Sequence, residues 1–249
     1  MYIIEQPKYA NGIFMHIAFL DANTDRSAFG QSHPKEHEKF RKLLAPHAPG
    51  WVLTDFQLPD GEFPQKVEDF DGLMISGSIA SVNSTDEWVV RLMDLIRAAV
   101  GKNIPVFGAC FGHQAIAKAL GGTVGYNPEG WVLGRYETHN HSPAPWMDHC
   151  GPMALHAAHK EQVLTPPSGA AIHAGTDLVP NGHMSVGPRV FSTQYHPELD
   201  HEFMQGLFDE MDGDLDPESL DHARASMTGD VASDQMARWM VAFFEQKTV

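Results

Sequence analysis

The sequence predicts an α/β domain with a parallel sheet, a mixed sheet edge and helices on both faces. Two observations indicate this class. Apolar segments of strand length alternate with segments of helix length through residues 15–122, which is the pattern of βαβ units. The apolar run at residues 70–78 also lacks the polar alternation of a half-exposed strand, as is typical of strands buried on both faces.

The individual elements follow from apolar periodicity and from the residues that end each segment. Residues 86–102 have the apolar spacing of an amphipathic helix, with acidic residues at the start and Gly101 just past the end. Strands are expected at residues 15–23, 51–58, 70–78, 103–110 and 189–199. Helices are expected at residues 33–44, 86–102, 111–122 and 233–246, the last with Ser233 as its N-cap.

The remaining segments indicate how the domain is completed. Residues 126–185 are rich in Gly, Pro and His and predict shorter antiparallel strands and loops, and the segment after Asp200 predicts two or three helices. All 249 residues fit a single domain. Residues 1–14 are expected to form a tail or an added edge strand, and residues from about 211 to 249 a C-terminal helical extension. The apolar stripe of the last helix predicts core or subunit contact, which leaves a homo-oligomer open.

The charge balance excludes several classes of partner. Asp and Glu number 32 against 17 Lys and Arg, and the formal net charge of -15 would repel a nucleic acid. No stretch is long and apolar enough to predict a membrane span, and no basic start followed by an apolar run predicts a signal peptide. Only two cysteines are present, so a reducing cytoplasm is the expected location.

One short segment, Gly108-Ala109-Cys110-Phe111-Gly112, places a thiol between an expected strand and an expected helix. This is the form of a nucleophile elbow, in which a sharp turn aims the nucleophile above the sheet and small neighbours leave it accessible. The thiolate is the reactive form of a cysteine, and a helix N-terminus favours that form. We therefore favour a catalytic Cys110 over a cysteine that packs as a small hydrophobe.

A second segment, Gln194 to Glu198, offers a base and a group to orient it. His196 and Glu198 are two residues apart, and Pro197 favours an extended His196, so both side chains are expected on the same side. Glu198 can then hold one ring nitrogen while the other faces a thiol. The peptide N–H groups of Phe111 and Gly77 are candidate donors to an oxyanion.

Three segments together resemble the class I glutamine amidotransferase family. Residues 108–122 resemble its nucleophile motif, residues 192–198 its His-Pro-Glu motif, and residues 75–82 its oxyanion-strand motif. The order and spacing also match, and the resemblance covers residues 15–208. The family's oxyanion strand usually ends Gly-Gly-Pro, whereas this chain has Ser76-Gly77-Ser78 and so retains only the middle glycine.

The resemblance implies a flavodoxin-like fold and a Cys-His-Glu triad. Cys110 would be the nucleophile, His196 the base and later acid, and Glu198 the orienting carboxylate. Gly77 and Phe111 would bind the oxyanion, and Gln114 would help to hold the substrate's glutamine moiety. The reaction would cleave the γ-amide of glutamine or of a small γ-glutamyl compound through a γ-glutamyl thioester, and it requires no cofactor or metal. Consistent with this, the histidine-rich segment at residues 139–150 lacks the ligand spacing of a zinc site.

Three functions remain open from the sequence. We favour a free-standing hydrolase, because the chain has no phosphate-binding glycine loop that would mark an ATP-using acceptor domain, and because its overall pattern resembles stand-alone GMP-synthase-like amidotransferases. The alternative is a glutaminase subunit that delivers ammonia to a synthetase in another chain. A non-catalytic binding or regulatory module on the same fold is the third, and the intact triad argues against it.

Overall fold

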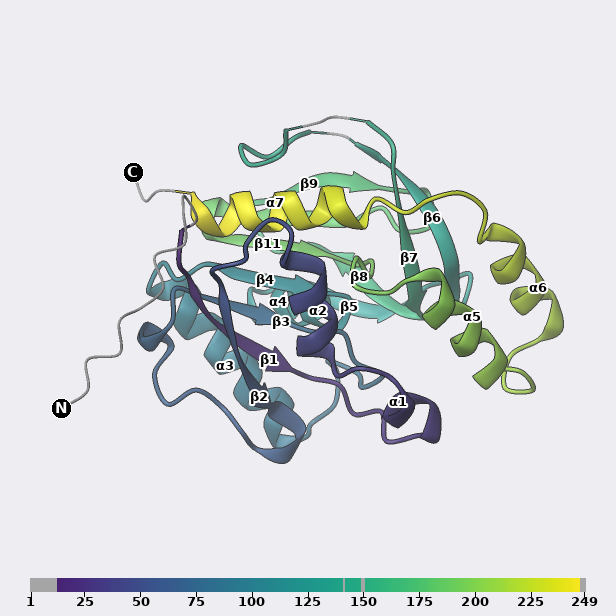
Figure 1. Cartoon of the computed structure of the whole chain (residues 1–249), viewed down its shortest axis with the longest axis horizontal. Helices are drawn as coiled ribbons and strands as arrows, with labels where there is room; N and C mark the ends of the chain where they lie inside the picture. Colours follow the sequence, from purple (N-terminus) through teal and green to yellow (C-terminus); the bar gives the residue numbers. More distant parts are fainter. Residues whose placement is uncertain (1–12, 141, 149–150, 247–249) are drawn as a thin grey trace.

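A nine-stranded mixed sheet forms the centre of the molecule in the computed structural model, which describes residues 13–140, 142–148 and 151–246 (Figure 1). Its strand order is β2-β1-β3-β4-β11-β10-β9-β6-β7. Residues 1–12 of the predicted tail and residues 141, 149 and 150 of the histidine-rich segment lie outside the described residues. The strands in that order are Val52–Gln57, His16–Asp21, Gly72–Ile75, Val106–Ala109, Val190–Thr193, His183–Val186, Ala170–Gly175, Val132–Asn140 and Met153–His159.

The first five strands of this order run parallel and carry the ends that matter for the site. The order 2-1-3-4 is that of flavodoxin-like doubly wound sheets, and it confirms the predicted α/β class. Ile75 of β3 pairs with Gly108 of β4, and Ala109 of β4 pairs with Thr193 of β11. Because the three strands are neighbours and parallel, the segments that follow them leave the sheet at the same edge.

The other four strands run antiparallel and form the mixed edge. β11, β10, β9 and β6 pair antiparallel in turn, and β7 closes the sheet beside β6. A separate two-stranded sheet joins β5 (Thr123–Tyr126) to β8 (Glu161–Thr165). The Gly-, Pro- and His-rich middle of the chain therefore forms antiparallel strands, as its composition predicts.

Helices cover both faces of the sheet. On one face α2 (Glu36–Leu44) and α7 (Ser233–Glu245) pack into a core cluster with the aromatic side chains of β1, β4 and β11. On the other face α3 (Glu87–Gly101) and α4 (Phe111–Ala119) pack into a second cluster. Seven residues of α7 are buried, so this helix is part of the central core, and Figure 1 shows it lying along the sheet.

Three shorter helices lie beside the sheet. These are α1 (Ala28–Ser32), α5 (His201–Glu210) and α6 (Pro217–Ser226), and α5 and α6 share a third apolar cluster with β6. Figure 1 shows α1 and α5 at the same end of the molecule. Three single 3-10 turns complete the described elements, at Leu58–Asp60, Val67–Asp69 and Gly187–Arg189.

Two details extend or correct the sequence analysis. Ser233 is the first residue of α7 and not its N-cap; the N-cap is Ala232, whose backbone N–H donates to the Ala154 carbonyl at 2.8 Å. The chain enters α7 through this bond to β7, so no side-chain cap is formed. Across the described ranges, none of the helices has both the length and the apolar character needed to span a lipid bilayer.

Candidate active site

Cys110 lies at a sharp turn between β4 and α4. Its φ of 47° and ψ of -103° are uncommon for a residue with a side chain, and such strain costs about 1–3 kcal/mol. The flanking glycines allow α4 to cross the sheet at backbone contact: a Cβ on Gly108 would lie 2.5 Å from the Gly112 carbonyl carbon, and one on Gly112 would lie 2.6 Å from the Ile75 oxygen. The N–H of Cys110 donates to the Thr193 carbonyl at 2.9 Å, which fixes the turn to β11.

His196 and Glu198 follow β11 and lie side by side. His196 Nδ1 is 2.7 Å from Glu198 Oε1. The sequence predicts a strand through residue 199, but β11 ends at Thr193 and the residues on either side of His196 form bends, so the two side chains meet across a bend and not along an extended strand. The Glu198 side chain is 0% exposed, and its second oxygen, Oε2, has no hydrogen-bond partner in the described part of the chain. The N–H of His196 donates to the His156 carbonyl of β7 at 2.8 Å, so the imidazole is held from both sides of the sheet edge.

The surroundings of His196 favour its protonated form. Burial alone would lower the pKa of this imidazole, but the carboxylate of Glu198 and the thiol of Cys110 outweigh burial and raise the pKa well above its ordinary value. Gly77 shows that the thiol and the imidazole are neighbours. A Cβ built on this glycine would lie 2.8 Å from His196 Cε1 and 3.7 Å from Cys110 Cβ. Cys110 and His196 therefore both lie beside Gly77.

Two backbone amides near Cys110, those of Gly77 and Phe111, have no backbone acceptor among the described residues, whereas the N–H of Gly112 donates to Ser76 O at 3.1 Å. Ser76 also fixes the Gly77 loop, because its hydroxyl accepts from Ala22 N at 2.9 Å and donates to Gly77 O at 2.9 Å. The serine that replaces the family's first glycine thus ties the loop after β3 to the end of β1.

Gln114 and Gln194 form a hydrogen-bonded chain that ends at the sulfur. The Gln114 amide donates to Glu161 O at 2.6 Å and lies 3.4 Å from Gln194 Oε1, and Gln194 Nε2 lies 3.7 Å from Cys110 Sγ. Gln114 is not among the residues that line the cavity described next. The sequence analysis did not single out Gln194, although it lies two residues before His196 in the same segment.

Cys110, Gly77, His196 and Glu198 line one cavity of about 370 Å³, at the carboxyl ends of β3, β4 and β11. This volume is within the range of small-molecule sites. The structure therefore brings the three sequence-predicted triad residues and the predicted Gly77 loop to one opening.

A second group of charged residues, which the sequence analysis also missed, borders the site. Glu36 at the start of α2 is 7% exposed, pairs with Lys39 at 2.8 Å and accepts from Asn23 Nδ2 at 3.2 Å. Burial raises the pKa of Glu36, and the neighbouring charge of Glu198 adds to this effect. No local pattern marks these residues, because Glu36 and Lys39 reach the site from the first turn of α2 and Asn23 from the loop that follows β1.

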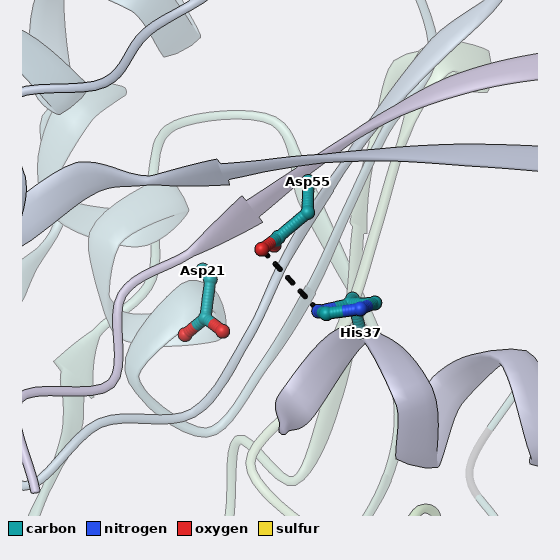
Figure 2. A group of neighbouring side chains, drawn as sticks. All are labelled: Asp21, His37 and Asp55. Atoms are coloured by element: carbon teal, nitrogen blue, oxygen red, sulfur yellow. Dashed lines mark ion pairs between the residues drawn. The ribbon is translucent and has the colours of Figure 1, made fainter. Parts of the chain in front are cut away.

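One group of potential metal ligands lies apart from the cavity. Figure 2 shows Asp21, His37 and Asp55, whose ligand-type atoms lie within 4.8 Å of one another. The Gln57 amide donates to both carboxylates, at 3.0 Å to Asp21 and 2.8 Å to Asp55, and His37 Nδ1 is 3.3 Å from Asp55 Oδ2. Because an amide hydrogen points at both carboxylates where a cation would bind, we assign no metal to this group.

Comparison with known proteins decides the family. A family model described as glutamine amidotransferase class-I matches residues 53–211, which is more than half of the chain. The chain belongs to this family. It is a class I glutamine amidotransferase-like hydrolase, in agreement with the resemblance seen in the three motifs.

Individual relatives extend the comparison. The amidotransferase is 28% identical over 213 residues to gamma-glutamyl peptidase 4 of Arabidopsis thaliana, covering 82% of this chain and 81% of the relative. It is 35% identical over 142 residues to the glutamine-hydrolyzing GMP synthase of Aeropyrum pernix, covering 52% of this chain but 24% of that longer protein. A glutamine amido transferase structure from Methylobacillus flagellatus has the same fold, with a TM-score of 0.70, 19% identity and 93% of each chain covered.

Proposed function

We propose that this amidotransferase hydrolyses the γ-amide bond of glutamine or of a γ-glutamyl compound, with Cys110 as nucleophile. The observation that carries the proposal is the convergence of a thiol, a carboxylate-bound imidazole and the Gly77 loop on one cavity. Phe111 does not line this cavity, but its N–H directly follows the thiol in the chain and has no backbone acceptor among the described residues. A thiolate attacks carbonyl carbon, an imidazolium protonates an amine, and paired amide donors stabilise an oxyanion. Together these groups perform acyl transfer through a thioester.

The proposed reaction has two halves. His196 takes the proton of the Cys110 thiol, and Sγ attacks the δ-carbonyl carbon. The oxyanion binds to the N–H groups of Gly77 and Phe111, and His196 gives the proton to the nitrogen as the C–N bond breaks. The amine leaves, and a γ-glutamyl thioester remains on Cys110. His196 then removes a proton from water as the water attacks the thioester carbonyl. The C–S bond breaks, His196 returns the proton to the sulfur, and glutamate leaves.

Glu198 and Gln194 support these steps. Glu198 fixes the ring of His196 and stabilises the imidazolium, and Gln194 donates toward the sulfur when it is negative. Gln114 holds Gln194 and so contributes to the position of the sulfur as well as to the glutamyl end of the site.

We favour a free-standing hydrolase. The similarity to gamma-glutamyl peptidase 4 extends over four fifths of both chains, whereas the GMP synthase match covers a quarter of a longer protein. The second candidate is a glutaminase that delivers ammonia to a synthetase in another chain, and the GMP synthase similarity is what supports it. Both candidates use the same cysteine chemistry.

The test is glutamate release from L-glutamine and from a set of γ-glutamyl amides and peptides by the purified chain. Cys110→Ala is expected to lower kcat/KM by at least about 10³-fold, because the nucleophile is lost. Cys150→Ala, which removes the other cysteine of the sequence, is the matched control and is expected to keep full activity.

A glutamine-analogue electrophile separates the remaining outcomes. Labelling of Cys110 together with steady turnover supports the free-standing hydrolase. Labelling with almost no turnover, restored when a synthetase partner is added, supports the second candidate. Absence of both labelling and turnover would contradict the proposal and favour a non-catalytic module on this fold.

A further inference from the structure

The cavity that holds Cys110 is larger than the triad requires. From Cys110 and His196 it continues past Glu198 and Leu199 to the side of α5, and across to the loop between β1 and α1. Figure 1 shows α1 and α5 next to each other at this end of the molecule. Phe29 of α1 packs on Phe203 of α5 with ring centroids 5.2 Å apart, so the two helices form one continuous wall.

The chemistry decides which half of a substrate occupies this extension. His196 must protonate the departing nitrogen, so that nitrogen lies on the His196 side of the sulfur. Glu198 and Leu199 follow His196 closely in the chain, α5 begins at His201, and Glu198, Leu199 and residues of α5 all line the cavity. The extension therefore takes the amine half of the substrate, and the glutamyl half lies on the opposite side of the sulfur.

The extension has an apolar surface that is open to a ligand. Leu207 and Met211 of the α5 wall are only partly buried. Ile79, directly after the Gly77 loop, is 77% exposed and lines the same cavity. A carbon chain bound between Ile79 and Leu207 would cover apolar area that water now contacts, which is favourable.

The extension also carries uncompensated negative charge. Asp25, Glu210 and Asp214 line it, and among the residues that the structure describes none of the three has an ion-pair partner. Lys39, which also lines the cavity, is bound to Glu36 at 2.8 Å and lies 4.2 Å from the centre of the Phe203 ring. Glu198 is paired with His196 at 2.7 Å, and its second oxygen, Oε2, has no hydrogen-bond partner among the described residues.

We propose that the amidotransferase prefers γ-glutamyl amides whose amine half has an apolar chain, a positive charge and no carboxylate. This inference rests on the proposed function and specifies its substrate class. A cation at the end of the chain would lie near Asp25, Glu210 and Asp214, and a carboxylate in the same place would be repelled. Small γ-glutamyl peptides, which carry a carboxylate on the amine half, would then be poor substrates.

Three substrates of matched length test the preference. N5-(4-aminobutyl)-L-glutamine is cationic, N5-pentyl-L-glutamine is neutral, and N5-(4-carboxybutyl)-L-glutamine is anionic. At low ionic strength kcat/KM is expected to fall in that order, by at least about tenfold from first to last, and the difference is expected to shrink with added salt. L-Glutamine is included as a reference.

Charge-reversal variants locate the preference. Asp214→Lys is expected to lower the ratio of cationic to anionic kcat/KM by at least about threefold, because it replaces one attractive charge with a repulsive one. Asp212→Lys is the matched control: Asp212 is an exposed carboxylate in the same turn that does not line the cavity, so the ratio is expected to change far less.

The outcomes separate this inference from the proposed function. Equal kcat/KM for the cationic and anionic compounds, or an equal effect of the two variants, overturns the charge preference while the hydrolase stands. Hydrolysis of L-glutamine but of none of the three amides also overturns it. Hydrolysis of no γ-glutamyl compound at all overturns the proposed function and this inference with it.

Discussion

The imidazole of His196 lies between two groups that favour its protonated form. Glu198 bonds one ring nitrogen at 2.7 Å, and Cys110 lies beside the same Gly77 that the ring contacts. Together they raise the pKa of His196 against the effect of burial. In the proposed reaction the raised pKa keeps His196 protonated, so the imidazolium can protonate the leaving amine. The pair His196–Glu198 therefore determines the pH range of activity.

Glu198→Gln tests this role at the level of one residue. The amide keeps the size of the carboxylate but removes its charge, so the pKa of His196 is expected to fall. The basic limb of the kcat/KM profile should then move to lower pH, and the maximal rate should drop by about 10²- to 10⁴-fold, as when the carboxylate of a triad is neutralised. Steady-state kinetics between pH 5 and 10 (roughly the range in which imidazole and thiol groups titrate) measure both changes.

The control for this variant is Glu202→Gln. Glu202 is an exposed carboxylate in the first turn of α5, and its replacement is expected to leave the pH profile unchanged. An unshifted basic limb in Glu198→Gln would mean that the carboxylate acts only on structure.

Among the elements, the turn from β4 into α4 depends most on backbone contact. Gly112→Ala would place a methyl group 2.6 Å from the carbonyl oxygen of Ile75, so α4 must move away from β3. The free energy of unfolding is expected to fall by about 1–3 kcal/mol, the usual cost of overpacking a core. Urea denaturation followed by circular dichroism measures this change.

Gly101→Ala is the matched substitution for that experiment. Gly101 is the last residue of α3, and a Cβ there would meet nothing within 4 Å. This variant is expected to be as stable as the original chain or slightly more stable. If both alanine variants unfold at the same urea concentration, the close crossing of α4 and β3 is not required.

The helices and strands also show which parts of the fold and the site could be predicted from the sequence. The strand before Cys110, the helix after it and the pair His196–Glu198 were predictable because each depends on residues that are neighbours in the chain. The position of α5 was not, since a helical period fixes an element but not the surface it packs on. Glu36, Lys39 and Gln194 were missed for the same reason: their roles arise from contacts with distant segments. Ser233 was expected as a cap, but β7 supplies the bond that starts α7.

At the scale of the whole molecule, burial determines how many of the histidines can be protonated in the folded protein. The sequence has 15 histidines, which would make the net charge strongly pH-dependent below about pH 6.5 if they were all exposed. Three of them, His113, His159 and His183, are almost fully buried in the central part of the protein, and burial lowers the pKa of each to about 3. Their Nε2 atoms have no hydrogen-bond partner in the described residues.

These buried neutral histidines predict a specific sensitivity to acid. Below about pH 6.5 the unfolded chain binds a proton at each position and the folded chain does not, so stability falls as the pH falls. Each histidine contributes a slope that approaches about 1.4 kcal/mol per pH unit, down to its folded pKa near 3. Between about pH 6.5 and 5 few carboxyl groups titrate, so this window isolates the contribution of the histidines to the pH dependence of stability.

Two variants test this argument. His183→Asn keeps a polar atom for Thr193, which His183 Nδ1 contacts at 2.9 Å, and it is expected to reduce the slope of stability against pH by the contribution of one histidine. His139→Gln, at an exposed histidine, is expected to leave it unchanged. Urea unfolding at several pH values measures the slopes, and equal slopes for the two variants would contradict the burial argument.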